Sequence, residues 1–108
     1  MKPFAQFFGD AEYQFKLTPA AVTELETKCG AGILAISNRV FAKQCSQAEI
    51  TETIRLALVG GGIAPKRAAE LVALYATERP LLDSYPVATK TLERLLCGHP
   101  NETTNGQA

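Results

Sequence analysis

The stretch from Tyr13 to Ile33 constrains the fold of this chain more than any other part of the sequence. Its apolar residues first alternate, as in a strand with one buried face. Thr18-Pro19 then marks a helix start, because a threonine hydroxyl caps free backbone N–H groups and proline suits the first helical position. Gly30 marks the helix end, because glycine adopts the left-handed conformation without strain. The stretch therefore predicts a strand, a capped helix and the start of a second helix.

A β-hairpin is predicted over residues 4–17. Gly9-Asp10 forms its two-residue loop, with glycine first as a type II′ turn requires. Phe7 falls on the polar face beside Glu12, and we expect it to belong to a protein-binding surface, because exposed strands and apolar side chains recruit other chains. The register set by this loop places the other large apolar side chains on one face: Phe4, Phe8, Tyr13, Phe15 and Leu17.

A helical body is predicted over residues 18–97, because apolar residues recur there at helical spacing. Leu81-Leu82 is predicted to form a turn or short helix ahead of the last helix. The fold predicted from this order is mainly α, a single domain of about five helices with an N-terminal β-hairpin. The boundaries expected after the first helix are residues 33–43 for the second, the capping box Ser46–Glu49 and the stop Gly60–Gly62 for the third, Pro65 as the start of the fourth and Pro86 as the start of the last.

Length and composition indicate one ordinary globular domain. The chain has 108 residues, of which 46% are apolar and 20% charged, so a domain over residues 1–98 can bury a core. The polar residues 99–108 are expected to form a disordered tail. Eleven basic residues balance eleven acidic ones, which argues against nucleic acid or an anionic membrane as the main partner. No run is long enough to span a bilayer, and the chain start lacks the apolar core of a signal peptide, so we expect a cytoplasmic protein.

Nothing in the sequence predicts enzymatic activity. The cysteines, Cys29, Cys45 and Cys97, match no zinc or redox spacing and are expected to be reduced thiols. His99, the only histidine, lies at the edge of the polar tail and offers no basis for a catalytic cluster. The carboxylates fall on polar helix faces without a pair suited to acid–base chemistry. We therefore expect no enzyme, no metal site and no cofactor.

The segment around Gly60–Gly62 allows other interpretations. The glycines precede Lys66, but a phosphate-binding loop needs a preceding strand and a Gly-Lys-Ser/Thr end, so a helix end is favoured. Lys66-Arg67 lies in the first turn of a helix and is either a solvated basic pair or an anion contact. The two helices around the glycines also loosely resemble a helix-turn-helix, which keeps DNA binding open as an alternative.

Several groups of residues together resemble a known family. They are the strand Tyr13–Leu17 with Thr18, the pair Leu25-Glu26, the turn Gly30–Ile33, the segment Ser46–Ile50 with Leu56–Leu58 and its glycine stop, and the final helix ending at Leu95–Gly98. In this order of elements, the chain resembles the small tail protein of gene transfer agents and related prophages. That family is grouped with phage tail assembly chaperones, and the resemblance covers the chain except for the tail.

The resemblance implies a non-enzymatic role in tail morphogenesis. Tail tube subunits resemble β-sandwiches with long strands, whereas this chain offers short strands and a helical body, so a tail assembly chaperone is favoured. By resemblance, such a chaperone binds the tape measure protein, keeps it soluble, helps to recruit tail tube proteins and is absent from the finished tail. A structural, tube-associated tail subunit is the first alternative, and a small helical DNA-binding regulator is the second.

Partner binding is expected to occur in an apolar groove that accepts amphipathic helices of the tape measure protein. Leu81, Leu82 and Tyr85, in the proline-bounded segment, are predicted to form an exposed apolar lip, and Phe7 is predicted as a further partner-binding residue. The partners that the resemblance implies are the tape measure and tail tube proteins in the cytoplasm of a bacterial host cell. A homo-oligomer is compatible with the same resemblance.

Overall fold

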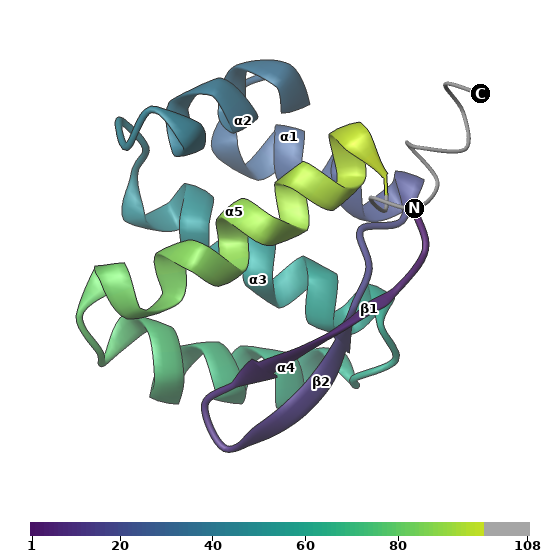
Figure 1. The fold of residues 1–108 in the computed structure, drawn as a ribbon, viewed down its shortest axis with the longest axis vertical. Coiled ribbons are helices and arrows are strands. Elements are labelled where there is room, and N and C mark those ends of the chain that lie inside the picture. The colour runs from purple at the N-terminus through teal and green to yellow at the C-terminus, as the bar shows by residue number, and fades with distance from the viewer. Residues whose placement is uncertain (99–108) are drawn as a thin grey trace.

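The helix α3 (Gln47–Gly60) organises the fold, because it contacts every other α-helix and the second strand (Figure 1). The structure is a computed structural model, and it describes residues 1–98. The predicted tail and His99 lie outside the described residues. The elements show a single helical domain with an N-terminal hairpin, which confirms the predicted fold class. In chain order they are β1 (Phe4–Phe8), β2 (Ala11–Phe15), α1 (Pro19–Cys29), α2 (Ile33–Phe41), α3 (Gln47–Gly60), α4 (Pro65–Val72), the π-helical turn η1 (Ala73–Thr77) and α5 (Leu81–Cys97).

The hairpin has the predicted register. Phe4 pairs with Phe15 and Phe8 pairs with Ala11, while Gly9 has a φ of 72°, in the left-handed region that favours glycine. The Phe15 ring is stacked on the Phe4 ring at a centroid distance of 5.7 Å and meets the Phe8 ring edge-on at 6.3 Å. All three rings are buried, so the aromatic face packs as one unit against the helices.

The second strand meets α3 through backbone contacts. The Lys16 N–H donates a hydrogen bond of 3.0 Å to the carbonyl oxygen of Ala57. Gly60 and Gly61 lie so close to the strand that a Cβ on Gly61 would overlap the carbonyl oxygen of Gln14. The glycine run ends α3, as predicted, and it also lets a helix and a strand approach without side chains between them.

The predicted helix caps are present. The Thr18 hydroxyl oxygen accepts a hydrogen bond of 3.1 Å from the Ala21 N–H, and Gly30 ends α1 with a φ of 66°. Ser46 and Glu49 make both hydrogen bonds of a capping box at the start of α3. These caps satisfy backbone groups that a helix end leaves free, so the local sequence is sufficient to define these boundaries.

The second helix ends at Phe41, before the predicted end at Lys43. Lys43 has a φ of 58°, and the Gln44 N–H donates a hydrogen bond of 2.8 Å to the carbonyl oxygen of Arg39. This is the geometry of a Schellman motif, which glycine usually forms. The prediction extended too far because a lysine holds the left-handed position here.

The last helix begins at Leu81, and the prediction that Pro86 opens it is wrong. Pro86 lies in the second turn of α5, where it cannot donate a hydrogen bond to the carbonyl oxygen of Leu82. Leu82 is exposed, so water can satisfy that oxygen. Ser84 and Val87 are buried on either side of the proline, and their packing holds the first turn of the helix against the body.

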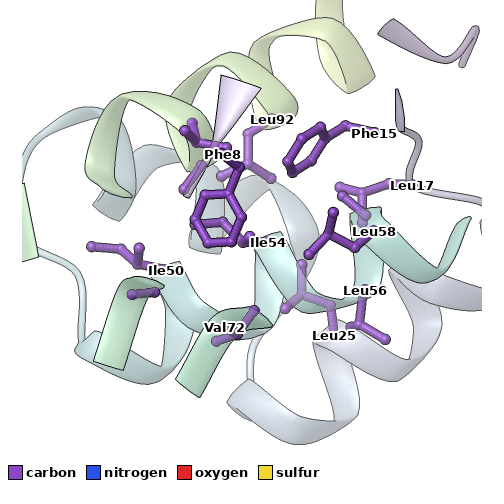
Figure 2. Packing of buried hydrophobic residues seen from close by; sticks show 14 of the residues in the cluster. Phe8, Phe15, Leu17, Leu25, Ile50, Ile54, Leu56, Leu58, Val72 and Leu92 are labelled. Carbon is purple, nitrogen blue, oxygen red and sulfur yellow. The ribbon is translucent and has the colours of Figure 1, made fainter. Parts of the chain in front are cut away.

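The hairpin and the helices contribute to one core. Figure 2 shows Phe8 and Phe15 of the hairpin pointing into the same interior as Ile54 of α3 and Leu92 of α5. Leu25 of α1 belongs to the same buried cluster. Because the hairpin supplies core residues, its position relative to the helices is determined by packing and not only by chain connection.

The fourth helix continues into the wider η1 turn. The Glu78 N–H donates a hydrogen bond of 3.2 Å to the carbonyl oxygen of Ala73, the five-residue spacing of a π-helix. Tyr75 is half-buried, and its ring lies edge-on to Phe8 at 6.2 Å. A Cβ on Gly9 would overlap the Tyr75 ring, so the tip of the hairpin lies directly on η1.

Candidate functional site

The turn from η1 to α5 carries a group of exposed apolar residues. Leu74, Pro80, Leu81, Leu82 and Pro86 are all exposed there, and they are named the apolar lip below. Other large apolar side chains are exposed elsewhere in the described chain, at Phe7, Leu34, Phe41 and Leu96. At the apolar lip, exposed apolar residues lie both before and after the turn that joins η1 to α5. These two helices contact each other (Figure 1).

The apolar lip contains three leucines, of which the sequence predicted two and missed one. Leu82 is 70% exposed and Leu81 is 37% exposed, as a partner-binding lip requires. Leu74 is 54% exposed and was not predicted. It lies outside the inward apolar stripe of its helix, and a leucine at an outward position is a signal that could have identified it.

Tyr85 lies close to the lip in sequence but is used within the fold. Its side chain is half-buried, and its hydroxyl donates a hydrogen bond to the carbonyl oxygen of Val40 in α2. The Lys43 ammonium lies 6.0 Å from the centroid of its ring. Tyr85 therefore connects α5 to α2, and it exposes less surface than the prediction of an exposed lip residue required.

Phe7 projects from the outer face of the hairpin, as predicted. It is 61% exposed and pairs with Glu12 across the strands. Its carbonyl oxygen accepts a hydrogen bond of 3.0 Å from the Gln6 side chain. The neighbouring Phe8, on the opposite face, is the residue that packs against Tyr75 of η1. The structure therefore leaves Phe7 outside the apolar lip.

The basic pair Lys66-Arg67 at the start of α4 contacts the hairpin. The Arg67 guanidinium lies 3.6 Å from the Asp10 carboxylate, which also accepts a hydrogen bond of 2.6 Å from the Tyr13 hydroxyl. That hydrogen bond raises the pKa of Tyr13. Because a carboxylate of the fold already faces Arg67, the anion-contact and DNA-binding interpretations of this helix start are disfavoured.

Glu49 is a buried carboxylate that stabilises a helix start. It is only 4% exposed. Its Oε2 accepts a hydrogen bond of 2.9 Å from Arg39 Nε, and its Oε1 accepts one of 2.9 Å from the Ser46 N–H. The hydrogen bond from Arg39 is the main cause that lowers the pKa of Glu49. With both oxygens occupied, this carboxylate is not available for proton transfer to a substrate.

Replacing Glu49 by glutamine is expected to lower the free energy of unfolding by about 2 kcal/mol at neutral pH, because Arg39 loses its charged partner. The pKa of Glu49 in the folded protein is lower than its ordinary value of 4.5. Its contribution is therefore complete above that pH and is lost as the pH falls through the folded pKa. The difference between Glu49→Gln and the wild type should then shrink.

Denaturant unfolding at a series of pH values from neutral to about pH 3 measures this difference. Glu12→Gln is the control, because Glu12 is an exposed carboxylate on the outer face of the hairpin. A difference between Glu49→Gln and the wild type that stays constant over the whole pH range would contradict the assignment.

Thiols, metal ligands and a surface hollow are the remaining candidates for chemistry in the described residues. Burial raises the pKa of Cys29 and of Cys45, which disfavours the reactive thiolate. Within residues 1–98, no group of three His, Cys, Asp or Glu side chains is placed to hold a metal ion.

A hollow of about 310 Å³ between α1 and α3 contains one carboxylate, Glu24, which pairs with Arg55 at 3.2 Å. None of the helices described is long and apolar enough to cross a bilayer.

The comparisons with known proteins identify a family but no individual relative. Searches of the curated proteins and of the solved structures gave no match. Residues 4–98 match the family described as phage tail tube protein, GTA-gp10, which confirms the predicted gene transfer agent and phage tail family, while the relation to chaperones stays a prediction. Because the matched range contains the hairpin and all the helices described above, the chain belongs to the phage tail tube protein family GTA-gp10.

Proposed function

We propose that the protein is a non-enzymatic adaptor of phage-type tail assembly, which binds the tape measure protein in the bacterial cytoplasm. The apolar lip is the observation that carries this proposal. Its leucines, Leu74, Leu81 and Leu82, are exposed beside a well-packed core, and grouped apolar side chains on a surface mark sites of protein contact. Membership in a phage tail family makes other tail proteins the first partners to test.

The sheet of this protein suits an adaptor better than a wall subunit of a tube. The described chain has one sheet with two strands. The free side of β2 is taken by α3, where Gly61 contacts the strand backbone. Only β1 keeps a side on which a further strand could pair. A tube wall of continuous strands needs pairing on both sides of each sheet, whereas an adaptor needs none.

The apolar lip has a size that favours reversible binding. Full burial of one leucine side chain contributes about 1.5–3 kcal/mol, so the three leucines together contribute at most roughly 9 kcal/mol. Association costs roughly 4–15 kcal/mol in lost translational, rotational and side-chain freedom. Because the two quantities are similar, the complex should form and dissociate readily, as required of a protein that leaves the finished tail.

Co-expression with the tape measure protein tests the proposal. The soluble fraction of the tape measure protein is expected to rise several-fold when this chain is present, and the two proteins should co-purify. The double variant Leu81→Ser/Leu82→Ser is expected to lose most of that rise. Leu34→Ser is the matched control, because Leu34 is a leucine of α2 that is 64% exposed. Equal solubility of the tape measure protein with and without the chain would contradict the proposal.

A structural tail subunit is the second candidate function, and the description of the family as a tail tube protein favours it. Such a subunit remains in the finished particle. Mass spectrometry of purified tails separates the two functions. The adaptor should be absent from the tails, whereas a structural subunit should be present in a fixed ratio to the main tube protein.

A further inference from the structure

The hairpin has one edge on which no strand pairs within the described residues. It is the side of β1 that faces away from β2, and it is named the β1 edge below. We propose that the β1 edge binds an extended segment of another protein, which adds a third strand to the sheet and places a carboxylate beside Lys90. This surface is separate from the apolar lip, and the proposal does not rest on the proposed function.

The strand register determines which backbone groups point to the β1 edge. Phe8 and Ala11 flank the two-residue loop, and such a pair exchanges both of its backbone hydrogen bonds. Because bonded and non-bonded pairs alternate in an antiparallel ladder, Gln6 also bonds to β2, whereas the N–H and C=O groups of Ala5 and Phe7 point away from it. Ala5 and Phe7 are both exposed, so the β1 edge offers donors and acceptors to a further strand.

The two edges of the hairpin differ in what covers them. By the same alternation Lys16, next to β2, points away from β1, and its N–H donates a hydrogen bond of 3.0 Å to the carbonyl oxygen of Ala57 in α3. At the β1 edge, the Phe7 carbonyl oxygen accepts a hydrogen bond of 3.0 Å from the Gln6 side chain, which can turn away. The strand FAQFF also contains no proline or charge, the usual protection of an edge against pairing.

Lys90 of α5 supplies a positive charge beside the middle of β1. Its ammonium lies 3.3 Å from the Gln6 side-chain oxygen and 5.3 Å from the centroid of the Phe4 ring, and α5 contacts β1 (Figure 1). Neither of these groups carries a negative charge. Glu93, three residues further along α5, is exposed, and no carboxylate of residues 1–98 forms an ion pair with Lys90. A carboxylate on an added strand would give Lys90 a charged partner.

The same lysine disfavours a second copy of this chain at the β1 edge. Two β1 strands would pair antiparallel about a two-fold axis. The register that pairs all five residues of β1 sets the Gln6 residues of the two copies opposite each other. Each Gln6 has its own Lys90 within hydrogen-bond distance, so two ammonium groups would meet near the axis. Like charges opposite each other destabilise a sheet, whereas a carboxylate at that position stabilises it.

Phe7 defines a second requirement for the added strand. Its side chain is 61% exposed and lies on the outer face of the hairpin, opposite to the face of Gln6. A residue beside Phe7 on an added strand would have its Cβ about 5 Å away, where aromatic and β-branched side chains make favourable contacts. The expected segment therefore has a carboxylate beside Gln6 and, at the next position, an apolar residue beside Phe7.

Two synthetic peptides test the proposal with the full chain. Both consist of alternating threonine and valine, with glutamate at the centre of one and lysine at the centre of the other. In calorimetric titration the glutamate peptide should bind at least about tenfold more tightly than the lysine peptide. In NMR hydrogen exchange, that peptide should slow the Ala5 and Phe7 amides by about tenfold or more. The Gln6 amide is the internal control, because it already bonds to β2.

Two pairs of variants separate the charge from the backbone pairing. Lys90→Gln should bring the two peptides to within about threefold of each other, whereas Lys66→Gln, at an exposed lysine of α4, should leave their difference unchanged. Ala5→Pro removes an outward N–H without breaking a bond to β2 and should abolish binding, whereas Ala5→Ser should not. Circular dichroism checks that each variant is folded.

Several outcomes overturn the proposal. They are no binding of the glutamate peptide, equal affinity of the wild type for both peptides, and binding that leaves exchange at Ala5 and Phe7 unchanged. Self-association that Ala5→Pro abolishes in analytical ultracentrifugation also overturns it, because a second copy would then occupy the β1 edge. Leu81→Ser/Leu82→Ser should not change peptide binding, and weakened binding in that variant would assign the peptide to the apolar lip instead.

Discussion

Replacing Gly61 by alanine is expected to lower the free energy of unfolding by about 3 kcal/mol, the upper end of the usual cost of overpacking. The added methyl group would overlap the carbonyl oxygen of Gln14. A backbone oxygen cannot rotate away as a flexible side chain can, so the end of α3 must move away from β2. That movement also breaks the hydrogen bond from Lys16 to Ala57. Because a domain of this size has roughly 5–15 kcal/mol of stability, this loss is a large fraction of the total.

Urea unfolding followed by circular dichroism measures the loss, with Gly32→Ala as the control. Gly32 has a φ of −71°, and a Cβ there would approach no closer than 3.8 Å to Glu26. The control should cost less than about 1 kcal/mol, the usual range for a change at a helix N-cap. Equal stability of Gly61→Ala and the wild type would show that α3 and β2 do not approach as closely as described.

Replacing Phe15 by alanine is expected to cost about 3–5 kcal/mol of unfolding free energy. Phe15 is fully buried, and its ring contacts the rings of Phe4 and Phe8, as Figure 2 shows for Phe8 and Phe15. The cavity cannot close easily, because β2 is held by β1 on one side and by α3 on the other.

Phe7→Ala is the matched control, because Phe7 is the same residue type on the opposite face of the same hairpin. Its expected effect on stability is within about 0.5 kcal/mol. The pair also tests the strand register, since a slip by one residue would exchange the two faces of the strand. Similar losses for Phe15→Ala and Phe7→Ala in urea unfolding would contradict the register.

The elements of this fold could be predicted where their signals are local. Thr18, Gly30 and Ser46 act on backbone groups within a few residues, and each defines the boundary that the sequence indicated. The glycine loop at Gly9 sets the hairpin register in the same way. Two boundaries were not predictable by these rules. Lys43 takes a position that usually needs glycine, and Pro86 is tolerated inside α5 because the residues around it are buried against other helices.

The candidate site was predictable only in part. Leu81 and Leu82 could be found because they are apolar residues between prolines, away from any helical stripe. Leu74 lies in η1, on the other side of the turn, and no local pattern connects it with Leu81 and Leu82. Tyr85 has the same local character as its neighbours, but a hydrogen bond to Val40 in α2 draws it into the fold.

The sequence by itself determined the helical class, most helix boundaries and the aromatic face of the hairpin, because capping and strand alternation depend on neighbouring residues. The tertiary structure alone decided the contact of Gly60 and Gly61 with the end of the hairpin and the pairing of Arg67 with Asp10. These features join segments that are far apart in the chain or separated by a turn. Their formation depends on how the helices pack, which a local pattern does not encode.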